Sequence, residues 1–320
     1  MVSKTAESAL KNAVVVIVGP TAVGKTDLAI QLAERLEGEI VSADSRLFYR
    51  GMDIGTAKPS RAERKRVPHH LIDVADPDQI WSLAMFQNAA RGAIKEIQLR
   101  NRLPFLVGGS GQYIRAVVKA WDIPHVEPDP SMRRALESWL AEIGADGLHT
   151  RLAVLDPRAA ERIDSRNTRR TIRAIEVIFH TGRLFSSQSK LGNSRYNLMQ
   201  IGLNRPRPEL YARIDARIQL MFNTGLVDEV QRLLDRGYSS DLPTMSAIGY
   251  QEIMQYLNGE LSLDEAILKM KRRTRIFVRR QANWFKSDDT SIYWYAMNEG
   301  TVQEIGARIT AWLRMKGVGV

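Results

Sequence analysis

The sequence feature that most constrains the fold is a phosphate-binding loop close to the amino terminus. Residues 19–26 read GPTAVGKT and match the pattern G-x-x-x-x-G-K-[ST]. The loop directly follows a run of β-branched residues at 14–18 and directly precedes a stretch with helical spacing, from about Lys25 to Leu36. In such a unit the glycines let backbone N–H groups converge on phosphate oxygens at the positive end of a helix. The unit predicts an α/β fold in which a P-loop NTPase-like parallel sheet is flanked by helices.

The loop also supplies the first candidate site residues. Lys25 provides a point charge for a phosphate, and the Thr26 hydroxyl is a candidate Mg²⁺ ligand. The predicted diphosphate-binding residues are Gly19, Pro20, Thr21, Ala22, Val23, Gly24, Lys25 and Thr26. A chance match in a chain of this length has odds on the order of one in a hundred, and a plain glycine turn is the structural alternative. The loop indicates a diphosphate or triphosphate but not the reaction, so kinases, NTPases and other diphosphate users stay open.

The rest of the chain predicts a core interrupted by a helical insert. Further short apolar runs indicate strands at 39–43, 103–107 and 197–203. From 124 to about 191 strand-like runs disappear, and Asp129-Pro130 and Asp156-Pro157 are typical helix starts. The predicted organisation is a P-loop catalytic core at 1–123, an all-helical insert at 124–195 and a second part of the core, with basic helices, at 196–320.

Charge indicates a polyanionic partner. The formal net charge is +10 and the pI is near 9.9, which favours contact with nucleic acid, although solubility alone is the simpler explanation. Two clusters of cations carry much of this charge: Lys269, Lys271, Arg272, Arg273, Arg275, Arg279 and Arg280 in one helical stretch, and Arg166, Arg169, Arg170 and Arg173 in the insert. Arg166, Arg170 and Arg173 are expected to share one helical face. Two separate clusters favour an extended polyanion over a merely solvated surface.

Two polar residues follow predicted strands beside the loop. Asp44, with Ser45, lies at the carboxyl end of the 39–43 strand, where ligands of α/β sheets gather, and is a candidate general base. An N-cap or a magnesium-shell ligand is the alternative for Asp44. Ser110 lies in a second glycine-rich turn, GGSGQY at 108–113, and is a candidate hydrogen-bond donor to substrate or base, although packing alone also explains the glycines.

Composition excludes several classes. The chain has no cysteine, which excludes disulfide frameworks, cysteine-based zinc modules and thiol catalysis. The longest early apolar run, at 14–18, is too short to span a bilayer, so we expect no membrane partner and a cytoplasmic location.

Five motifs in order carry a resemblance to a known family. They are GPTAVGKT at 19–26, SADS at 42–45, GMDIGTAKP at 51–59, PHHLIDVADP at 68–77 and LVGGSGQYI at 106–114. Together they resemble the motif set of tRNA dimethylallyltransferases (tRNA isopentenyltransferases) of bacterial type. The resemblance continues through 169–176, 213–217, 248–252 and 279–281, and so covers nearly the whole chain.

The resemblance implies an activity and a set of site residues. Members of the family transfer a dimethylallyl group from dimethylallyl diphosphate to the exocyclic amine of adenosine 37 in tRNA. By resemblance, residues 19–26 would hold the diphosphate with Mg²⁺, Asp44 would take the amine proton, and Ser110 and Arg217 would complete the catalytic set. The implied tRNA contacts are Asp44, Ser45, Arg46, Leu47, Arg169, Arg170, Thr171, Ile172, Arg173, Ser246, Ala247, Ile248, Gly249, Tyr250, Gln251, Arg279, Arg280, Gln281, Trp284 and Lys286. The insert would contact the anticodon stem-loop, and we expect a monomer.

The sequence departs from the family pattern at two positions, and other functions compete with it. Ser110 stands where threonine is common, which keeps the hydroxyl, and Gln251 stands where arginine is frequent, which puts that one tRNA contact in doubt. A nucleoside or nucleotide kinase, an adenylate isopentenyltransferase acting on free nucleotide, and a non-catalytic nucleic-acid-binding NTPase module are the alternatives. The kinase explains the core but not the two basic clusters, and the adenylate enzyme would not need the insert.

Overall fold

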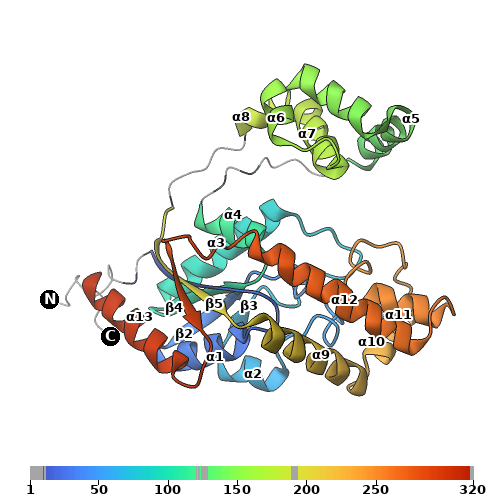
Figure 1. The fold of residues 1–320 in the computed structure, drawn as a ribbon. Helices are drawn as coiled ribbons and strands as arrows, with labels where there is room; N and C mark the ends of the chain where they lie inside the picture. Colours follow the sequence, from blue (N-terminus) through green and yellow to red (C-terminus); the bar gives the residue numbers. More distant parts are fainter. Residues whose placement is uncertain are drawn as a thin grey trace. The chain divides into compact units, whose positions relative to one another are not determined.

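The computed structural model describes residues 10, 12–119, 121, 123, 129–188 and 194–317, and it divides into two compact units. Residues 1–118 and 195–320 form the first unit, and residues 119–194 form the second (Figure 1). We refer to them as the core unit and the helical unit. The boundaries predicted from the sequence, 123/124 and 195/196, lie within five residues of the boundaries of the helical unit, 118/119 and 194/195.

The core unit is built on one six-stranded parallel sheet. Its strand order is β3-β2-β4-β1-β5-β6, and every paired neighbour runs parallel. The strands are β1 (Ala13–Val18), β2 (Gly38–Ser42), β3 (His69–His70), β4 (Leu103–Gly108), β5 (Asn197–Asn204) and β6 (Ile292–Ala296). The predicted α/β class and the four predicted strands are confirmed. Because β1 and β4 are flanked by strands on both sides, all of their residues are buried, which suits runs of branched apolar side chains.

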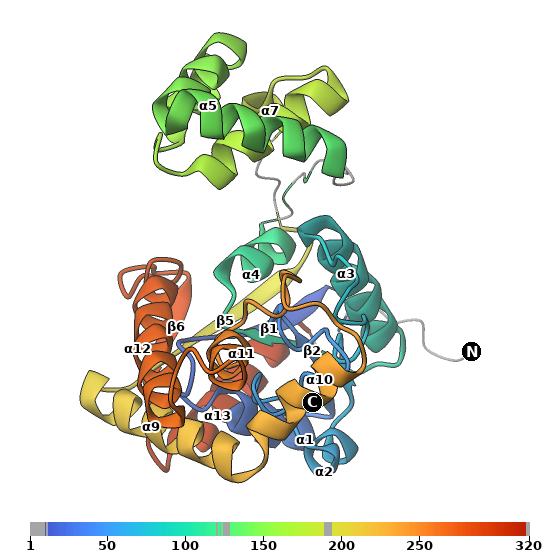
Figure 2. The same ribbon diagram turned by 90° about the vertical axis from the view of Figure 1, so that its right-hand side faces the viewer.

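Helices cover both faces of the sheet. They are α1 (Lys25–Arg35), α2 (Arg61–Arg66), α3 (Leu83–Leu99), α4 (Gly111–Val118), α9 (Arg207–Asn223), α10 (Leu226–Asp235), α11 (Tyr250–Leu257), α12 (Leu263–Ala282) and α13 (Thr301–Met315). In Figures 1 and 2, α3 and α4 lie above the sheet, while α1, α2 and α13 lie below it. Helices α9 to α12 pack on one another at one side of the unit.

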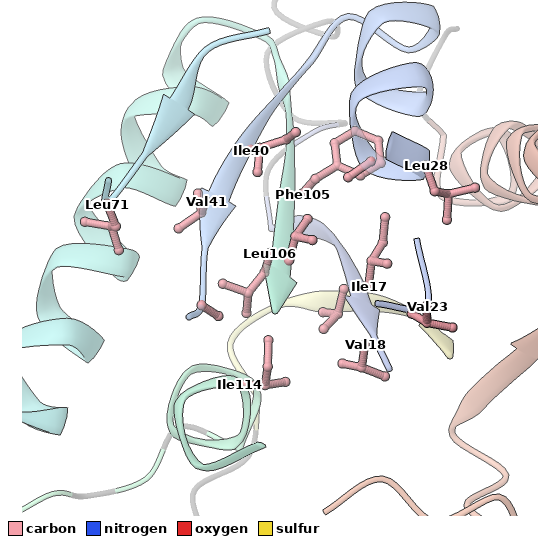
Figure 3. Packing of buried hydrophobic residues seen from close by; sticks show 14 of the residues in the cluster. Ile17, Val18, Val23, Leu28, Ile40, Val41, Leu71, Phe105, Leu106 and Ile114 are labelled. Atoms are coloured by element: carbon pink, nitrogen blue, oxygen red, sulfur yellow. The ribbon is translucent and has the colours of Figure 1, made fainter. Parts of the chain in front are cut away.

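A continuous apolar core holds these layers together. Figure 3 shows Ile17 of β1 and Phe105 of β4 directed toward Leu28 of α1, with Ile114 of α4 near the other end of the same strands. All four side chains are at most 1% exposed. At about 25 cal/mol per Å² of apolar surface, each such side chain contributes roughly 1.5–3 kcal/mol of transfer free energy. This packing fixes the carboxyl ends of β1, β2 and β4, where the candidate site residues follow.

The helical unit has its own small core. It consists of α5 (Pro130–Leu155), α6 (Pro157–Arg162), α7 (Thr168–Thr181) and α8 (Phe185–Gln188). The two predicted helix starts are confirmed, because Asp129 accepts from the N–H groups of Ser131 and Met132, and Asp156 accepts from that of Ala159. Leu148 and Leu152 of α5 pack in one cluster with Ile175 of α7.

One expectation for this unit is wrong. Arg166 does not share a helical face with Arg170 and Arg173, because α7 begins only at Thr168 with Asn167 as its N-cap. Arg166 lies in the turn before the helix, where its guanidinium donates to Asp164 at 2.6 Å. The local Asp-to-Arg contact and the asparagine cap end the helical pattern that spacing alone suggested.

Two strands were not predicted. β3 has only two residues, and β6 lies at the edge of the sheet with only Ile292 and Tyr295 buried, so neither shows the continuous apolar run of a central strand. Within the part of the chain that the structure describes, no helix is both long and apolar enough to cross a bilayer.

Candidate active site

The phosphate-binding loop lies between β1 and α1, and two of its glycines have conformations that other residues avoid. Gly19 has φ 151°, and a Cβ there would lie 2.7 Å from the Leu203 carbonyl oxygen of β5. Gly24 is the left-handed N-cap of α1, with φ 109°. Because both positions favour glycine, the loop holds its backbone close to the sheet and turns directly into the first helical turn. Thr26 is the second residue of that helix.

Lys25 is the central charge of the loop. Its Nζ donates to the carbonyl oxygens of Gly19, at 3.0 Å, and Pro20, at 2.8 Å. Burial lowers the pKa of Lys25 from 10.5 to about 8; Asp44 opposes that shift and Arg217 adds to it. Two residues that are far from the loop in the sequence, Asp44 and Arg217, therefore both act electrostatically on Lys25. The predicted base and the predicted second cation are brought to the predicted diphosphate loop.

Asp44 is held at the carboxyl end of β2. Its Oδ1 accepts the backbone N–H of Arg46 at 3.1 Å, and the residues that follow form a turn rather than a helix. The Asp44 side chain thus forms an Asx-type turn and does not cap a helix, which was one alternative for this residue. Arg46 in turn donates to the carbonyl oxygens of Pro243 and Thr244, each at 3.4 Å. The strand end fixes the Asp44 backbone, and the turn fixes its carboxylate.

Ser110 lies in the turn beside Asp44. β4 pairs with β2, and a Cβ on Gly108 would overlap the carbonyl group of Ala43, so the turn approaches the residue before Asp44 as closely as glycine permits. The Ser110 carbonyl oxygen accepts the N–H groups of Tyr113, at 2.9 Å, and Ile114, at 3.1 Å, which begins α4. The Ser110 side chain is half-buried. Ser110 therefore follows β4 at the same sheet edge at which Asp44 follows β2.

Arginines of the β5–α9 segment surround the other side of the loop. Arg205 Nε donates to the Val23 carbonyl oxygen at 3.0 Å, and Arg213 Nε donates to that of Ala22 at 2.8 Å. Burial, followed by the nearby Arg213 charge, lowers the pKa of Arg217, with Asp27 opposing. A guanidinium stays charged at neutral pH even so. The arrangement concentrates positive charge around a turn that favours anions.

Gln281 joins the loop to the second glycine turn and was assigned differently from sequence. Its Oε1 accepts the Thr21 N–H at 2.9 Å, and its Nε2 donates to the Gly109 carbonyl oxygen at 3.1 Å. The residue is only 5% exposed. Its amide is thus occupied inside the protein, and we no longer assign it as an RNA contact.

The other residues expected to contact RNA differ in the solvent exposure of their side chains. Exposed side chains are those of Arg169, Arg170, Ser246, Arg279, Arg280 and Lys286, and half-buried ones are those of Asp44, Ser45, Arg46, Leu47, Arg173, Ile248, Gln251 and Trp284. Buried ones are those of Thr171, Ile172, Ala247 and Tyr250, with Gly249 buried too. Thr171 and Ile172 face the helical unit's own core, and Tyr250 faces that of the core unit. Their assignment as side-chain contacts is therefore withdrawn.

Several cations of the basic helix α12 are used inside the protein. Arg275 donates to Asp215 of α9 at 2.6 Å, Lys269 donates to Gln255 of α11 at 2.7 Å, and Arg273 pairs with the buried Glu252. Arg273 also donates to Gln251 at 2.7 Å. These contacts fix α12 on α9 and α11. The exposed arginines of α12 that can meet a polyanion are Arg272 in its middle and the pair Arg279 and Arg280 at its carboxyl end.

A buried carboxylate organises the 51–59 motif, which sequence alone indicated only as a turn. Glu229 of α10 accepts the N–H groups of Asp53, Ile54 and Gly55 at 2.7–3.1 Å, and its Oε1 accepts the Tyr250 hydroxyl at 2.6 Å. Burial first, and then the Glu229 charge, raises the pKa of Tyr250, so its hydroxyl remains a donor. The Lys58 ammonium closes the other end of the motif on Asp53, at 2.5 Å, and Asp73, at 2.6 Å.

Glu229→Ala is expected to lower the free energy of unfolding by about 3 kcal/mol or more, because three backbone donors and one hydroxyl lose their acceptor at a buried site. Urea unfolding followed by circular dichroism measures the change. Asp228→Ala is the matched control, since this neighbouring acid on α10 is exposed and its loss is expected to cost about 1 kcal/mol at most. Equal effects of the two substitutions would contradict the structural role of Glu229.

The fold and the site define the class, namely a P-loop α/β protein in which a carboxylate and a half-buried arginine lie near the lysine of a phosphate loop. Comparison with known families then gives the family itself. The family model for IPP transferase matches residues 47–288, and that for isopentenyl transferase matches residues 12–74. The chain belongs to the IPP transferase family, as the ordered motifs predicted.

Individual relatives agree with this assignment. A tRNA dimethylallyltransferase of Roseiflexus sp. (strain RS-1) is 55% identical over 272 residues, which cover 85% of this chain and 89% of that protein. The solved full-length tRNA isopentenylpyrophosphate transferase of Bacillus halodurans is 43% identical, with a TM-score of 0.72 and coverage of 96% of this chain and 98% of that one. A eukaryotic dimethylallyltransferase, whose structure is described as acting on tRNA, is 26% identical with a TM-score of 0.76, covering 94% and 77%.

Proposed function

We propose that this chain transfers the dimethylallyl group of dimethylallyl diphosphate to the exocyclic amine of adenosine 37 in tRNA, giving N6-isopentenyladenosine and diphosphate. One observation supports the proposal: the 19–26 loop and Asp44 follow the carboxyl ends of β1 and β2 in one parallel sheet, and Asp44 and Arg217 both lie near enough to Lys25 to shift its pKa. The cations suit a diphosphate leaving group. The carboxylate suits a nucleophile that must lose a proton. A tRNA is the substrate named for the relatives.

The cations act on the bond that breaks. An allylic carbon tolerates developing positive charge, so the main barrier is departure of the diphosphate as its C–O bond opens. Negative charge then grows on oxygens held by the loop N–H groups, Lys25 and Arg217, and preorganised donors stabilise charge at the transition state better than water does. Arg217 is well suited because its half-buried guanidinium stays charged although partial burial lowers its pKa.

Asp44 acts on the bond that forms. The adenine amine attacks the allylic carbon, a C–N bond replaces the C–O bond, and the nitrogen becomes cationic until it loses a proton. Asp44 Oδ1 is engaged by the Arg46 N–H, which orients the carboxylate and leaves it as the acceptor for that proton. Ser110, on the neighbouring turn, is proposed to donate a hydrogen bond to the substrate or to Asp44.

Thr26 is proposed to hold Mg²⁺ together with the diphosphate. Its hydroxyl is a hard oxygen donor at the first turn of α1, and magnesium is usually bound by few protein oxygens along with phosphate oxygens and water. The residues present therefore fit that ion. When bound, it would supply further charge to the leaving diphosphate.

Exposed cations of both units are proposed to bind the anticodon stem-loop. Arg279 and Arg280 of α12 lie in the core unit, and Arg169 and Arg170 of α7 lie in the helical unit, which we assign to the anticodon stem. Extruding an adenine from a stacked loop costs a few kcal/mol, which backbone contacts by such cations would offset. We expect the enzyme to act as a monomer in the cytoplasm, where tRNA and dimethylallyl diphosphate meet.

An acceptor comparison tests the proposal. Three reaction mixtures are compared. Two contain dimethylallyl diphosphate, one with an unmodified tRNA transcript and one with AMP. The third contains a nucleoside, with ATP in place of the prenyl donor. We expect prenylated tRNA and little product from the other two mixtures. Preferred prenylation of AMP would instead identify an adenylate isopentenyltransferase, and a phosphorylated nucleoside with untouched tRNA would identify a kinase.

The pKa of Lys25 predicts how diphosphate binding depends on pH. Since burial lowers that pKa to about 8, the free protein loses the Lys25 charge as the pH rises from 7 to 9, while a bound anion favours the charged form. Between pH 7 and pH 9 the affinity for inorganic diphosphate is therefore expected to fall in both proteins, and the fall in the wild type should exceed that in Lys25→Met by a factor of up to about ten. Titration calorimetry at both pH values measures this, and the ligand's own protonation is common to both proteins. Parallel pH profiles would contradict the prediction.

A further inference from the structure

The carboxyl end of α12 is seated on both glycine-rich turns of the site. Gln281, the penultimate residue of the helix, bonds Thr21 in the 19–26 loop and Gly109 in the second turn. Shortly after the helix ends, Trp284 packs so closely on Gly111 that a Cβ there would overlap its ring. Arg115 Nη2 donates to the Trp284 carbonyl oxygen at 2.7 Å, and its guanidinium lies 5.2 Å from the indole centroid.

The bond between Gln281 and Thr21 spans the longest sequence separation among the hydrogen bonds described at the site. Thr21 and Gln281 are 260 positions apart, and Gly109 and Gln281 are 172 apart. Both amide atoms of one side chain are used, and the side chain is 5% exposed. A change in the position of the α12 end therefore reaches the backbone of both turns through one buried group, without a solvent-exposed intermediate.

The same helix end carries exposed charge on the residues just before Gln281. Arg279 and Arg280 are exposed, whereas Gln281 is buried. Upstream, the ion pairs of Arg275 and Arg273 fasten α12 to α9 and α11. The helix is thus fixed along its middle. At its end, the exposed Arg279 and Arg280 are directly followed by Gln281, which bonds the diphosphate loop.

We propose that Gln281 is a positioning residue that couples RNA binding on the α12 end to the geometry of the diphosphate loop and of the Ser110 turn. The inference rests on the proposed function. RNA phosphates held by Arg279 and Arg280 restrain the helix end, and Gln281 transmits that restraint to the Thr21 N–H and the Gly109 carbonyl. A restrained loop loses less freedom when it closes on an anion, so it binds diphosphate more tightly.

The expected sign separates this route from simple electrostatics. A bound RNA repels a second polyanion, which would weaken diphosphate binding, whereas preorganisation of the loop strengthens it. Gln281→Met retains the length of the side chain and the charge of the protein but has neither hydrogen bond. The change therefore removes the mechanical link and leaves the repulsion in place.

The test measures the Kd of inorganic diphosphate by calorimetry, with and without a saturating anticodon stem-loop RNA. We expect RNA to tighten diphosphate binding about ten-fold in the wild type, a typical coupling, and to change it less than two-fold in Gln281→Met. Gln87→Met is the matched control, because Gln87 is 2% exposed and donates to the Ala116 carbonyl oxygen at 2.5 Å, away from the loop. It is expected to retain the wild-type coupling. Gln281→Glu, which keeps only the acceptor for Thr21, is the second variant and is expected to retain part of it.

Each outcome has a defined meaning. Coupling in Gln281→Met that equals the coupling in the Gln87→Met control would overturn the inference. Should the methionine variant not fold, the same result in Gln281→Glu would overturn it. So would the absence of coupling in a wild type that still prenylates tRNA, and in both cases the proposed function stands. A wild type that binds neither ligand would overturn the proposed function and the inference with it. A fall in kcat with an unchanged KM for RNA in Gln281→Met would support positioning over a structural role.

Discussion

Asp44→Ala is expected to lower the turnover of tRNA by about 10²- to 10⁴-fold, the usual contribution of a general base. The physical reason is that the carboxylate, oriented by the Arg46 N–H, is the acceptor for the proton that the amine must lose. Binding of inorganic diphosphate is expected to change little at pH 7, because the substitution removes a negative charge that repels the anion, and this offsets the further fall in the Lys25 pKa, which Asp44 opposes. Single-turnover assays with saturating tRNA separate the chemical step from binding.

Two variants serve as controls for this prediction. Asp44→Asn keeps the shape and an acceptor for the Arg46 N–H but not the basic group, so it should be nearly as slow as the alanine variant. Asp78→Asn makes the same chemical change at an exposed position and should retain wild-type turnover. Wild-type product formation by Asp44→Ala would remove Asp44 from the mechanism and would favour a non-catalytic module.

Arg217→Met is expected to lower kcat by about 10²- to 10³-fold, the range found when one preorganised donor to a developing negative charge is removed. Arg217 is half-buried and lies close enough to Lys25 to lower the pKa of that lysine, and in the proposed mechanism its charge acts on the leaving diphosphate. Because the charge on the leaving group grows as the C–O bond opens, kcat should fall more than affinity for inorganic diphosphate. Rapid-quench measurements with labelled dimethylallyl diphosphate give both values.

Arg207→Met is the control for Arg217, because Arg207 begins the same helix but is exposed. It should leave kcat within about two-fold of the wild type, as surface substitutions usually do. If Arg217→Met raised only KM for the prenyl donor, with kcat unchanged, Arg217 would be a binding residue and not a stabiliser of the leaving group.

What the sequence could predict is what is local along the chain. The strand, loop and helix from β1 to α1 follow from neighbouring residues, as do the proline helix starts at Asp129 and Asp156. The position of Asp44 followed from one rule, that ligands gather at the carboxyl ends of parallel strands. Local patterns misled where short contacts delayed the start of a helix, as those of Asp164 and Asn167 do before α7.

What the sequence could not predict depends on contacts between distant segments. Glu229 meets the 51–59 motif across 174–176 positions, and no spacing rule connects them. From the sequence, Gln281 is one more polar residue on a basic helix. Only the structure shows its two hydrogen bonds to Thr21 of the loop and to Gly109. Thr171 follows the exposed Arg170, and Tyr250 lies in the same predicted RNA-binding run as the exposed Ser246. Only packing shows that the side chains of Thr171 and Tyr250 are themselves buried.

The central claim, that one pocket captures a prenyl donor by its two phosphates while Asp44 receives the proton of a tRNA amine, is tested most directly by mass spectrometry of tRNA nucleosides from cells lacking this gene. Isopentenyl-adenosine should disappear, return with the wild-type gene, and remain absent with Asp44→Ala expressed at the same level. Unchanged isopentenyl-adenosine in the deleted cells, or its full return with Asp44→Ala, would contradict the account.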